Sequence, residues 1–492
     1  MTVKMKRYKQ ILLFIVLSAT LFGCNDWLDV SPKTEIKAGD NFNNEQGYKD
    51  ALTGVYLLMT DESLYGRELT FGLNDALAQY YTGIPGTSHP YYYPSIYAYD
   101  NDASVAIFDN IWSNMYKAIA NDNELIENIE TADESMFTGR NYNLIKGEAY
   151  GLRAFLHFDL LRLFAPSYAS DPNADAIPYV TKVGTKVTAL LTVDEVLKKV
   201  LDDLSTAETY LINDPVVDAG GSGSIDEEYE RDRFYKFNYY AAKLLEARIY
   251  LYMSDYDKAN EAAQAIINQN YFTWTPDNEI TTSNANDRNY VFSEELIFAL
   301  YDNNLTDSYS NYFTGTTGLY MQDNNYEGLY ELNKTGYYAD YRYTYVTNLL
   351  SSDNIRVSTK LKQPTGGTTA YLHRMPLMRI SEAYYIAAEC ALKNNNTSSA
   401  IDDLTTVRVQ RNLPDDLSQT LTSDEVQDEI YKEYAKEFMC EGQLFYYFKR
   451  LNLTYIKIPS VSGGSLTYSY VTPGYVLPMP DDEIEYGGRS NE

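Results

Sequence analysis

The sequence predicts a mainly α-helical fold in one domain over residues 38–492: a scaffold of helix pairs with large irregular loops and a few short strands. Three observations predict it. Apolar residues recur at spacings of three and four along nine segments, two pairs of segments share one spacing of small residues, and long polar stretches separate them. The nine expected helices cover residues 44–60, 104–130, 141–165, 192–212, 238–253, 256–269, 379–393, 398–411 and 423–450.

The helix pairs are indicated by small residues at matched positions. Ala247 is followed twelve residues later by Ala259, and Ala388 is followed at the same separation by Ala400. Small side chains let two helices approach closely. The pattern resembles the tetratricopeptide unit, with Pro414 near its closing position. Such units bury their apolar faces only against neighbours, so we expect the other long helices to pack beside them.

Two long stretches, 61–103 and 300–375, show little periodicity and are rich in Gly, Asn, Asp and Tyr. We expect short strands or hairpins within them. Loops of this length inside a compact domain usually serve a function.

Residues 1–23 are typical of a bacterial lipoprotein signal peptide. Four basic residues precede an apolar run over 11–21, which is shorter than the roughly 20 residues of a spanning helix. The sequence Leu-Phe-Gly-Cys at 21–24 resembles a lipobox, where cleavage leaves Cys24 lipidated at the new N-terminus. An ordinary secretory signal with an incidental cysteine is the alternative. We expect residues 24–37 to form an extended tether.

The mature chain is strongly acidic. From Cys24 onward it holds 36 Lys and Arg against 69 Asp and Glu, a formal charge of −33. Nucleic acid is disfavoured as a partner because phosphate binding needs clustered cations. Direct adhesion to anionic headgroups is disfavoured for the same reason.

Tyrosine is unusually frequent, with 49 residues against 18 Phe and 3 Trp. A tyrosine presents a flat apolar face and a hydroxyl that favours water. Tyrosines among Asn, Asp and Gly would suit ligands with apolar C–H faces and many hydroxyls, as sugars have. The alternative is that most of them simply seal a large, loop-rich surface.

Few features point to catalysis. The three histidines, His89, His157 and His373, form no HExxH pattern, so we expect no zinc site and a packing role for His157. The glycine-rich stretch 219–224 lacks the Lys-Ser/Thr of a phosphate-binding loop. With 69 acidic residues, spacing gives no information about a glycosidase carboxylate pair. We assign no catalytic residue and no cofactor.

A metal site is not assigned either. Asp171, Asn173 and Asp175 match the first ligand positions of a calcium loop, but Ala176 and Lys182 break the EF-hand pattern. A looser calcium site there stays open.

Besides Cys24 the chain has two cysteines, Cys390 and Cys440. Both fall in expected helices, so we expect buried free thiols; a single bridge between them is the alternative.

Seven segments along nearly the whole chain carry motifs: 24–32 (CNDWLDVSP), 112–119 (WSNMYKAI), 146–155 with 159–164 (KGEAYGLRAF, DLLRLF), Asp340 with Arg342, 379–382 with Ala388 and Glu389 (RISE, AE), Glu437, Phe438, Glu441 and Gly442 with Lys449 and Arg450, and 477–480 with Glu483 and Ile484 (LPMP, EI). In this order they resemble the SusD/RagB family of Bacteroidetes surface lipoproteins. The chain departs from the family pattern at Tyr434 and 445–448, where Arg and Asp-Leu are common, which puts local packing of that helix in doubt.

The resemblance implies a role and a partner. Family members capture a nutrient, usually a glycan, at the outer surface, and generally bind rather than cut. It implies a lipid-anchored, outward-facing position in the outer membrane and delivery to a SusC-like TonB-dependent transporter. A peptide- or protein-binding member and a lipid-anchored glycoside hydrolase are the alternatives. The N-terminal part would cover about 38–215 and the C-terminal SusD/RagB part about 270–492.

The motif residues themselves are expected to be structural. Arg153, Arg379 and Arg450 lie on helices next to acids, which favours ion pairs within the scaffold. Trp112 is expected in the core.

The family's binding face is usually built from loops away from the repeat helices, which here points to 71–103 and 300–345. Tyrosine rings there could stack on a sugar, and neighbouring Asn and Asp side chains could bond its hydroxyls. The candidate ligand-binding residues are Asn74, Asp75, Tyr80, Tyr81, Tyr91, Tyr92, Tyr93, Tyr97, Asn101, Asp102, Tyr301, Tyr309, Tyr312, Tyr320 and Tyr326.

Overall fold

The structure is a computed structural model that describes residues 42–489, apart from 85, 218–227, 315–317, 351–353 and 416. The predicted signal peptide, Cys24 and the tether to residue 37 lie outside the described residues. Eight of the nine expected helices are confirmed to within a few residues: α3 (Glu45–Met59), α6 (Asp102–Ile129), α7 (Asn141–Phe164), α8 (Val193–Leu211), α9 (Tyr239–Tyr252), α10 (Tyr256–Ile267), α15 (Ile380–Lys393) and α16 (Thr397–Gln410).

Helix ends follow local chemistry. Thr192 accepts a hydrogen bond from the backbone of Glu195 and the Glu195 side chain accepts one in return, so a capping box starts α8. Asn238 and Asn396 cap α9 and α16 through their side chains.

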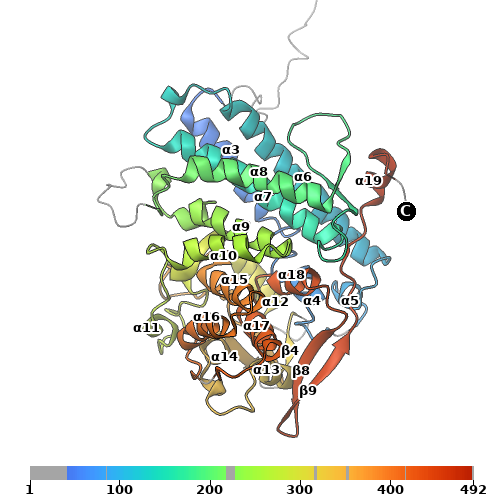
Figure 1. Cartoon of the computed structure of the whole chain (residues 1–492), viewed down its shortest axis with the longest axis vertical. Helices are drawn as coiled ribbons and strands as arrows, with labels where there is room; N and C mark the ends of the chain where they lie inside the picture. Colours follow the sequence, from blue (N-terminus) through green and yellow to red (C-terminus); the bar gives the residue numbers. More distant parts are fainter. Residues whose placement is uncertain are drawn as a thin grey trace, which may run out of the picture.

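The predicted helix pairs form the centre of the molecule. α9 packs on α10 and α15 packs on α16, while α10 also packs against α15. The four alanines at the matched positions, Ala247, Ala259, Ala388 and Ala400, are fully buried. Figure 1 shows α3, α6, α7 and α8 on one side of this layer and α17 and the loop-rich part on the other. The mainly α, tetratricopeptide-like scaffold is therefore confirmed.

The expected helix over 423–450 is wrong, because it is two helices, α17 (Ser423–Glu437) and α18 (Gln443–Arg450). Between them Cys440 and Gly442 have positive φ angles of 66° and 69°. The amide of Cys440 donates to Asp75 Oδ2 at 2.7 Å, and a Cβ on Gly442 would lie 2.2 Å from the carbonyl oxygen of Leu69. Contacts with a distant loop therefore break the helix.

Short elements lie in the loop-rich stretches and between the long helices. Residues 300–375 hold short strands, as expected, whereas the described part of 61–103 holds two short helices and no strand. The strands pair antiparallel as β1 (Asp175–Pro178) with β2 (Leu190–Thr192), β3 (Leu296–Tyr301) with β7 (Arg374–Arg379), β6 (Ile355–Ser358) with both β4 (Met321–Gln322) and β5 (Thr347–Leu350), and β8 (Ile456–Ser462) with β9 (Ser465–Val471). The short helices are α4 (Leu73–Leu77), α5 (Tyr92–Ser95), α11 (Asp277–Ile280), α12 (Leu305–Tyr312), α13 (Asp323–Leu329), α14 (Tyr341–Thr344) and α19 (Asp481–Tyr486), with single 3-10 turns η1 (Glu134–Met136), η2 (Glu228–Glu230), η3 (Arg233–Tyr235), η4 (Ser293–Glu295) and η5 (Tyr337–Ala339).

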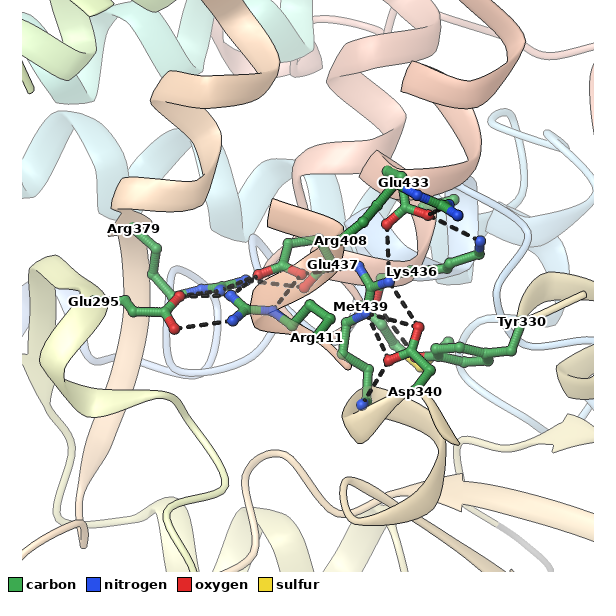
Figure 2. Close-up of polar contacts among 12 residues, drawn as sticks. Glu295, Tyr330, Asp340, Arg379, Arg408, Arg411, Glu433, Lys436, Glu437 and Met439 are labelled. Carbon is green, nitrogen blue, oxygen red and sulfur yellow. Dashed lines mark hydrogen bonds and ion pairs between the residues drawn. The ribbon is translucent and has the colours of Figure 1, made fainter. Parts of the chain in front are cut away.

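The motif arginines make buried ion pairs, as predicted. Arg153 pairs with Asp203 at 2.6 Å, Arg450 with Glu389 at 2.7 Å and Arg379 with Glu441 at 2.7 Å. Arg379 belongs to a larger buried charge network, part of which is drawn in Figure 2. Its six cations and six anions are Arg342, Lys360, Arg379, Arg408, Arg411 and Lys436 with Glu295, Glu331, Asp340, Glu433, Glu437 and Glu441.

The network joins the loop-rich part to the helices. Asp340 and Arg342 come from the second long loop, Arg379 from the end of β7 and Glu437 from α17. All twelve side chains are buried. Because a buried charge is stable only when paired and hydrogen-bonded, these residues fix the relative positions of the segments that carry them.

The structural predictions for Trp112, His157 and the two cysteines are confirmed. Trp112 is 5% exposed and packs on Phe164. His157 is fully buried, accepts a hydrogen bond from the Val180 amide at 3.0 Å, and burial lowers its pKa to about 3. Cys390 and Cys440 are buried free thiols. Over the described ranges, every helix is too short or too polar to cross a membrane.

Candidate functional site

The two tyrosine-rich loops contact one another. The ring of Tyr320 lies against Gly83, and the amide of Gln322 donates to Thr82 Oγ1 at 3.0 Å. Nearby, Arg67 Nη1 donates to the Tyr312 hydroxyl at 2.7 Å. Segments more than two hundred residues apart are therefore in contact; their helices α4 and α12 lie near one another in Figure 1.

Seven predicted residues from these segments are partly exposed and are called here the tyrosine face: Tyr92, Tyr93, Tyr97, Asn101, Tyr309, Tyr312 and Tyr320. Tyr92 and Tyr93 meet edge to face, with ring centroids 5.2 Å apart. The ring of Tyr309 stacks on Phe313 at 5.7 Å. Such packing fixes ring orientations before a ligand arrives, which lowers the entropy lost on binding.

Hydrogen bonds hold the remaining members. The Tyr97 hydroxyl donates to the carbonyl of Leu77 at 2.7 Å and accepts from Gln79 at 3.1 Å. Asn101 caps α6 by accepting from the Ala103 amide at 3.0 Å. Asp102, the first residue of α6, is exposed.

The positive charge of Arg67 is neutralised on this surface. Arg67 Nε donates to Glu68 at 2.9 Å, and Arg67 Nη1 also pairs with Glu62. The guanidinium therefore has carboxylate partners in addition to Tyr312. The arrangement favours a neutral ligand over an anionic one.

Six predicted ligand residues instead lie in the core, each at most 8% exposed: Asn74, Asp75, Tyr80, Tyr81, Tyr91 and Tyr326. Tyr80 donates to the carbonyl of Ala435 at 2.6 Å, and Asn74 Nδ2 donates to the carbonyl of Gly442 at 3.3 Å. Tyr326 donates to Met439 Sδ at 3.1 Å. These side chains attach the loops to the break between α17 and α18 and position the tyrosine face from beneath.

Asp75 is the central attachment point. Its Oδ2 accepts from the Cys440 amide at 2.7 Å, and burial raises its pKa well above the usual range. Tyr81 donates to the carbonyl of Phe71 in the same loop, and the Tyr91 hydroxyl lies against Gly72. A fully buried carboxyl in this position supports the fold and is not accessible to a ligand in solvent.

Tyr301 lies in other surroundings. It is 48% exposed, and its ring packs on Tyr235 at 5.5 Å and on His373 at 5.1 Å. It lines a cavity of about 220 Å³ together with Lys49 and Lys236.

Sequence reasoning missed the residues that join the two loops. Gly83, Thr82 and Arg67 position Tyr320, Gln322 and Tyr312, but none stands out in composition. The available signal was Gly83, two residues after the Tyr80-Tyr81 pair. A glycine marks a position where a ring or a backbone can approach closely.

The chemistry that the tyrosine face offers is binding. It presents aromatic rings with phenol and amide groups, which suit a ligand with apolar faces and hydroxyls. Within the described part of the chain, no group of three or more His, Cys, Asp or Glu is placed to hold a metal ion. Fold and surface together define a helix-pair protein with a loop-built, tyrosine-rich surface.

Comparison with known proteins finds similarity to SusD-like proteins. A family model described as "Starch-binding associating with outer membrane" matches residues 26–251. SusD-like protein P2 of Formosa agariphila is 29% identical over 270 residues, 54% of this chain and 46% of the relative. SusD-like protein P38 of the same organism is 23% identical over 403 residues, 69% of this chain and 72% of the relative.

Solved structures share the fold. A SusD superfamily protein from Bacteroides thetaiotaomicron has a TM-score of 0.68 at 23% identity, covering 91% of this chain and 98% of that one. A SusD-like carbohydrate binding protein from Bacteroides vulgatus has a TM-score of 0.68 at 18% identity, covering 91% and 97%. The chain is thus similar to SusD-like proteins in the sequence of its N-terminal half and in its overall fold. The part of this chain that aligns with SusD-like protein P2 spans about half of that relative's length.

Proposed function

We propose that this protein is a glycan-binding lipoprotein of the outer membrane, anchored through Cys24 and facing the cell exterior. It binds an oligo- or polysaccharide on the tyrosine face and delivers it to a SusC-like TonB-dependent transporter. It acts by binding, without cutting the glycan.

The proposal rests mainly on the assembly of the tyrosine face from two loops that are distant in the sequence. Tyr320 against Gly83 and Tyr312 against Arg67 place partly exposed rings on one surface. Aromatic faces suit the C–H faces of a pyranose, and phenol and amide groups suit its hydroxyls. Arg67 is neutralised by its carboxylate partners, which favours a neutral glycan.

Two further observations support the location and the partner. The basic, apolar and lipobox sequences over 1–24 favour lipid anchoring at Cys24. The matching family model is described by association with the outer membrane. The proposed transporter partner follows from the family resemblance of the motifs.

Affinity electrophoresis through gels that contain neutral polysaccharides tests the binding function. We expect the mature protein with Cys24→Ala to be retarded by at least one glycan, and Tyr320→Ala with Tyr93→Ala to remove most of the retardation. Tyr486→Ala, which changes a 71% exposed tyrosine on α19, is the matched control and should leave mobility unchanged.

Two results would overturn the proposal. Binding of peptides with no retardation by any glycan would establish the peptide-binding alternative. Turnover of a glycan by the purified protein, lost on changing one carboxylate, would establish the hydrolase alternative. The transporter is tested separately, by co-purification of a SusC-like protein with a tagged chain from outer membranes.

A further inference from the structure

A cavity of about 240 Å³ lies away from the tyrosine loops, between α17, the end of α18 and the start of β8. Pockets for drug-sized ligands are typically about 300–1,000 Å³, so this cavity suits a smaller group, on the scale of one sugar ring. It is formed by the C-terminal residues 424–457.

The floor of the cavity is aromatic and rigid. The ring of Tyr431 stacks beside Tyr447 with centroids 6.3 Å apart, and Phe448 lies 5.8 Å from it. Tyr447 and Phe448 are 3% and 1% exposed, so core packing fixes their positions. At the rim, Tyr455 is 56% exposed and offers a further ring.

One wall is a single face of α17. Asp424, Gln427, Asp428 and Tyr431 follow at i, i+3, i+4 and i+7, which places them on one side of the helix. This face offers two carboxylates and a carboxamide above the aromatic floor.

Gln427 has an unused acceptor. Its Nε2 donates to the Tyr447 hydroxyl at 3.0 Å, while its buried Oε1 accepts no hydrogen bond from the described residues. A buried acceptor without a partner is unfavourable, so a ligand hydroxyl that donates to Oε1 would be stabilised there.

The charged groups around the cavity favour a neutral ligand that donates hydrogen bonds. Lys457 Nζ pairs with Asp428 at 2.9 Å, and Lys432 pairs with the same carboxylate at 3.2 Å. Asp428 is thereby neutralised, and Asp424 remains as an acceptor at the rim. An anionic ligand would meet this carboxylate, whereas a hydroxyl could donate to it.

Exposed rings continue beyond the cavity. Tyr470 lies opposite Lys457 in the β8–β9 register and is 59% exposed, and Tyr468 is 37% exposed. In Figure 1 this hairpin projects from the body of the molecule. The cavity is therefore flanked by further aromatic surface.

We propose that this cavity is a second saccharide site, which takes one neutral pyranose unit of the glycan bound by the tyrosine face. The ring lies over Tyr431 and against Tyr455, and its hydroxyls donate to Gln427 Oε1 and Asp424. This assignment rests on the proposed function, since it takes the ligand to be a glycan. Two sites on one protein would raise the affinity for long chains over that for short ones.

Saturation-transfer NMR with methyl glucoside, galactoside, mannoside, xyloside and fucoside tests the site on the mature Cys24→Ala protein. We expect at least one glycoside to receive saturation equally from the parent and from Tyr320→Ala. Tyr455→Ala and Gln427→Met should reduce this transfer about tenfold, because each removes one of the proposed contacts. Tyr338→Ala, which changes a 69% exposed tyrosine elsewhere, is the control.

The outcomes separate the two proposals. Two results would overturn the second site alone. In the first, saturation transfer is unchanged by Tyr455→Ala and Gln427→Met. In the second, no glycoside receives saturation, although polysaccharide still retards the protein. If Tyr455→Ala abolishes saturation transfer and polysaccharide binding does not depend on Tyr320, the second site is supported and the tyrosine face is overturned as the binding surface. No binding of any glycan overturns both.

Discussion

The ring of Tyr320 occupies the space where a side chain on residue 83 would begin: a Cβ added to Gly83 would lie 1.9 Å from Tyr320 Cε2. The two residues come from the two tyrosine-rich loops, so the first loop sets the position of a ring in the second. Even a methyl group at residue 83 would displace that ring.

Gly83→Ala should therefore weaken glycan binding about tenfold, because the displaced Tyr320 ring loses its place in the binding face. Isothermal titration with the retained glycan measures the affinity. Gly54→Ala is the matched control: no atom lies within 4 Å of its added Cβ, and alanine in a helix is favoured over glycine by about 1 kcal/mol. Equal affinities of the two variants would contradict a role for Tyr320.

Glu437→Gln should lower the free energy of unfolding by about 3–5 kcal/mol, because the buried guanidiniums lose a charged partner. Glu437 accepts from Arg342 at 3.0 Å and from Arg411 at 2.7 Å, and it also pairs with Arg379. Urea unfolding followed by circular dichroism measures the change. Lys198→Ala removes the exposed pair with Asp194 and should change stability by at most about 1 kcal/mol. Similar values for both variants would show that the network is not stabilising.

Acid should destabilise the protein partly through Glu331. Burial alone would raise its pKa, but Lys436, Lys432 and Lys334 lower it from 4.5 to about 2. A depressed pKa in the folded state adds stability that is complete above the unfolded pKa and is lost as pH falls from about 4.5 towards 2. Glu331→Gln should thus be less stable than the parent at pH 7, with the difference shrinking below pH 4.5. Urea midpoints of the parent and of Glu331→Gln measure this difference across the pH range. A difference that does not change with pH would contradict the lowered pKa of Glu331.

The thiols of Cys390 and Cys440 should not react in the native protein. Both are buried, and burial raises the pKa of the Cys390 thiol to about 12, so the reactive thiolate is scarce. Ellman's reagent should label no thiol of the folded Cys24→Ala protein and two after unfolding in urea without reductant. Fewer than two would show that the cysteines are oxidised.

Cys24→Ala should abolish membrane retention and leave glycan affinity unchanged, because the proposed anchor and the proposed binding face use different residues. Fractionation of cells measures the first effect and affinity electrophoresis of the purified protein the second. Loss of binding in the variant would contradict this division between anchor and binding face.

Most of the scaffold could be predicted because its signals are local. The three- and four-residue periodicity and the buried alanines at 247, 259, 388 and 400 lie within single helices or helix pairs. The break between α17 and α18 could not be predicted this way. It depends on Asp75, 365 residues before Cys440 in the chain, while apolar residues continue through the break.

The candidate site could be predicted only at the level of segments. Both tyrosine-rich loops were singled out by composition, and the structure places them in contact. Which tyrosines face outward could not be predicted, because a tyrosine can be buried whenever its hydroxyl finds an acceptor. Tyr80 is buried because it reaches the carbonyl of Ala435, and that partner lies far away in the sequence.

The attachment of Asp75 to Cys440 also sets an order of events during the life of the chain. A protein emerges from the ribosome and crosses the inner membrane with its N-terminus leading, so the first tyrosine loop arrives long before the segment that holds it. The loop reaches its final place only once residue 440 of 492 has followed. The proposed glycan binding therefore depends on residues as far along the chain as Cys440, and a copy truncated before α18 would lack it.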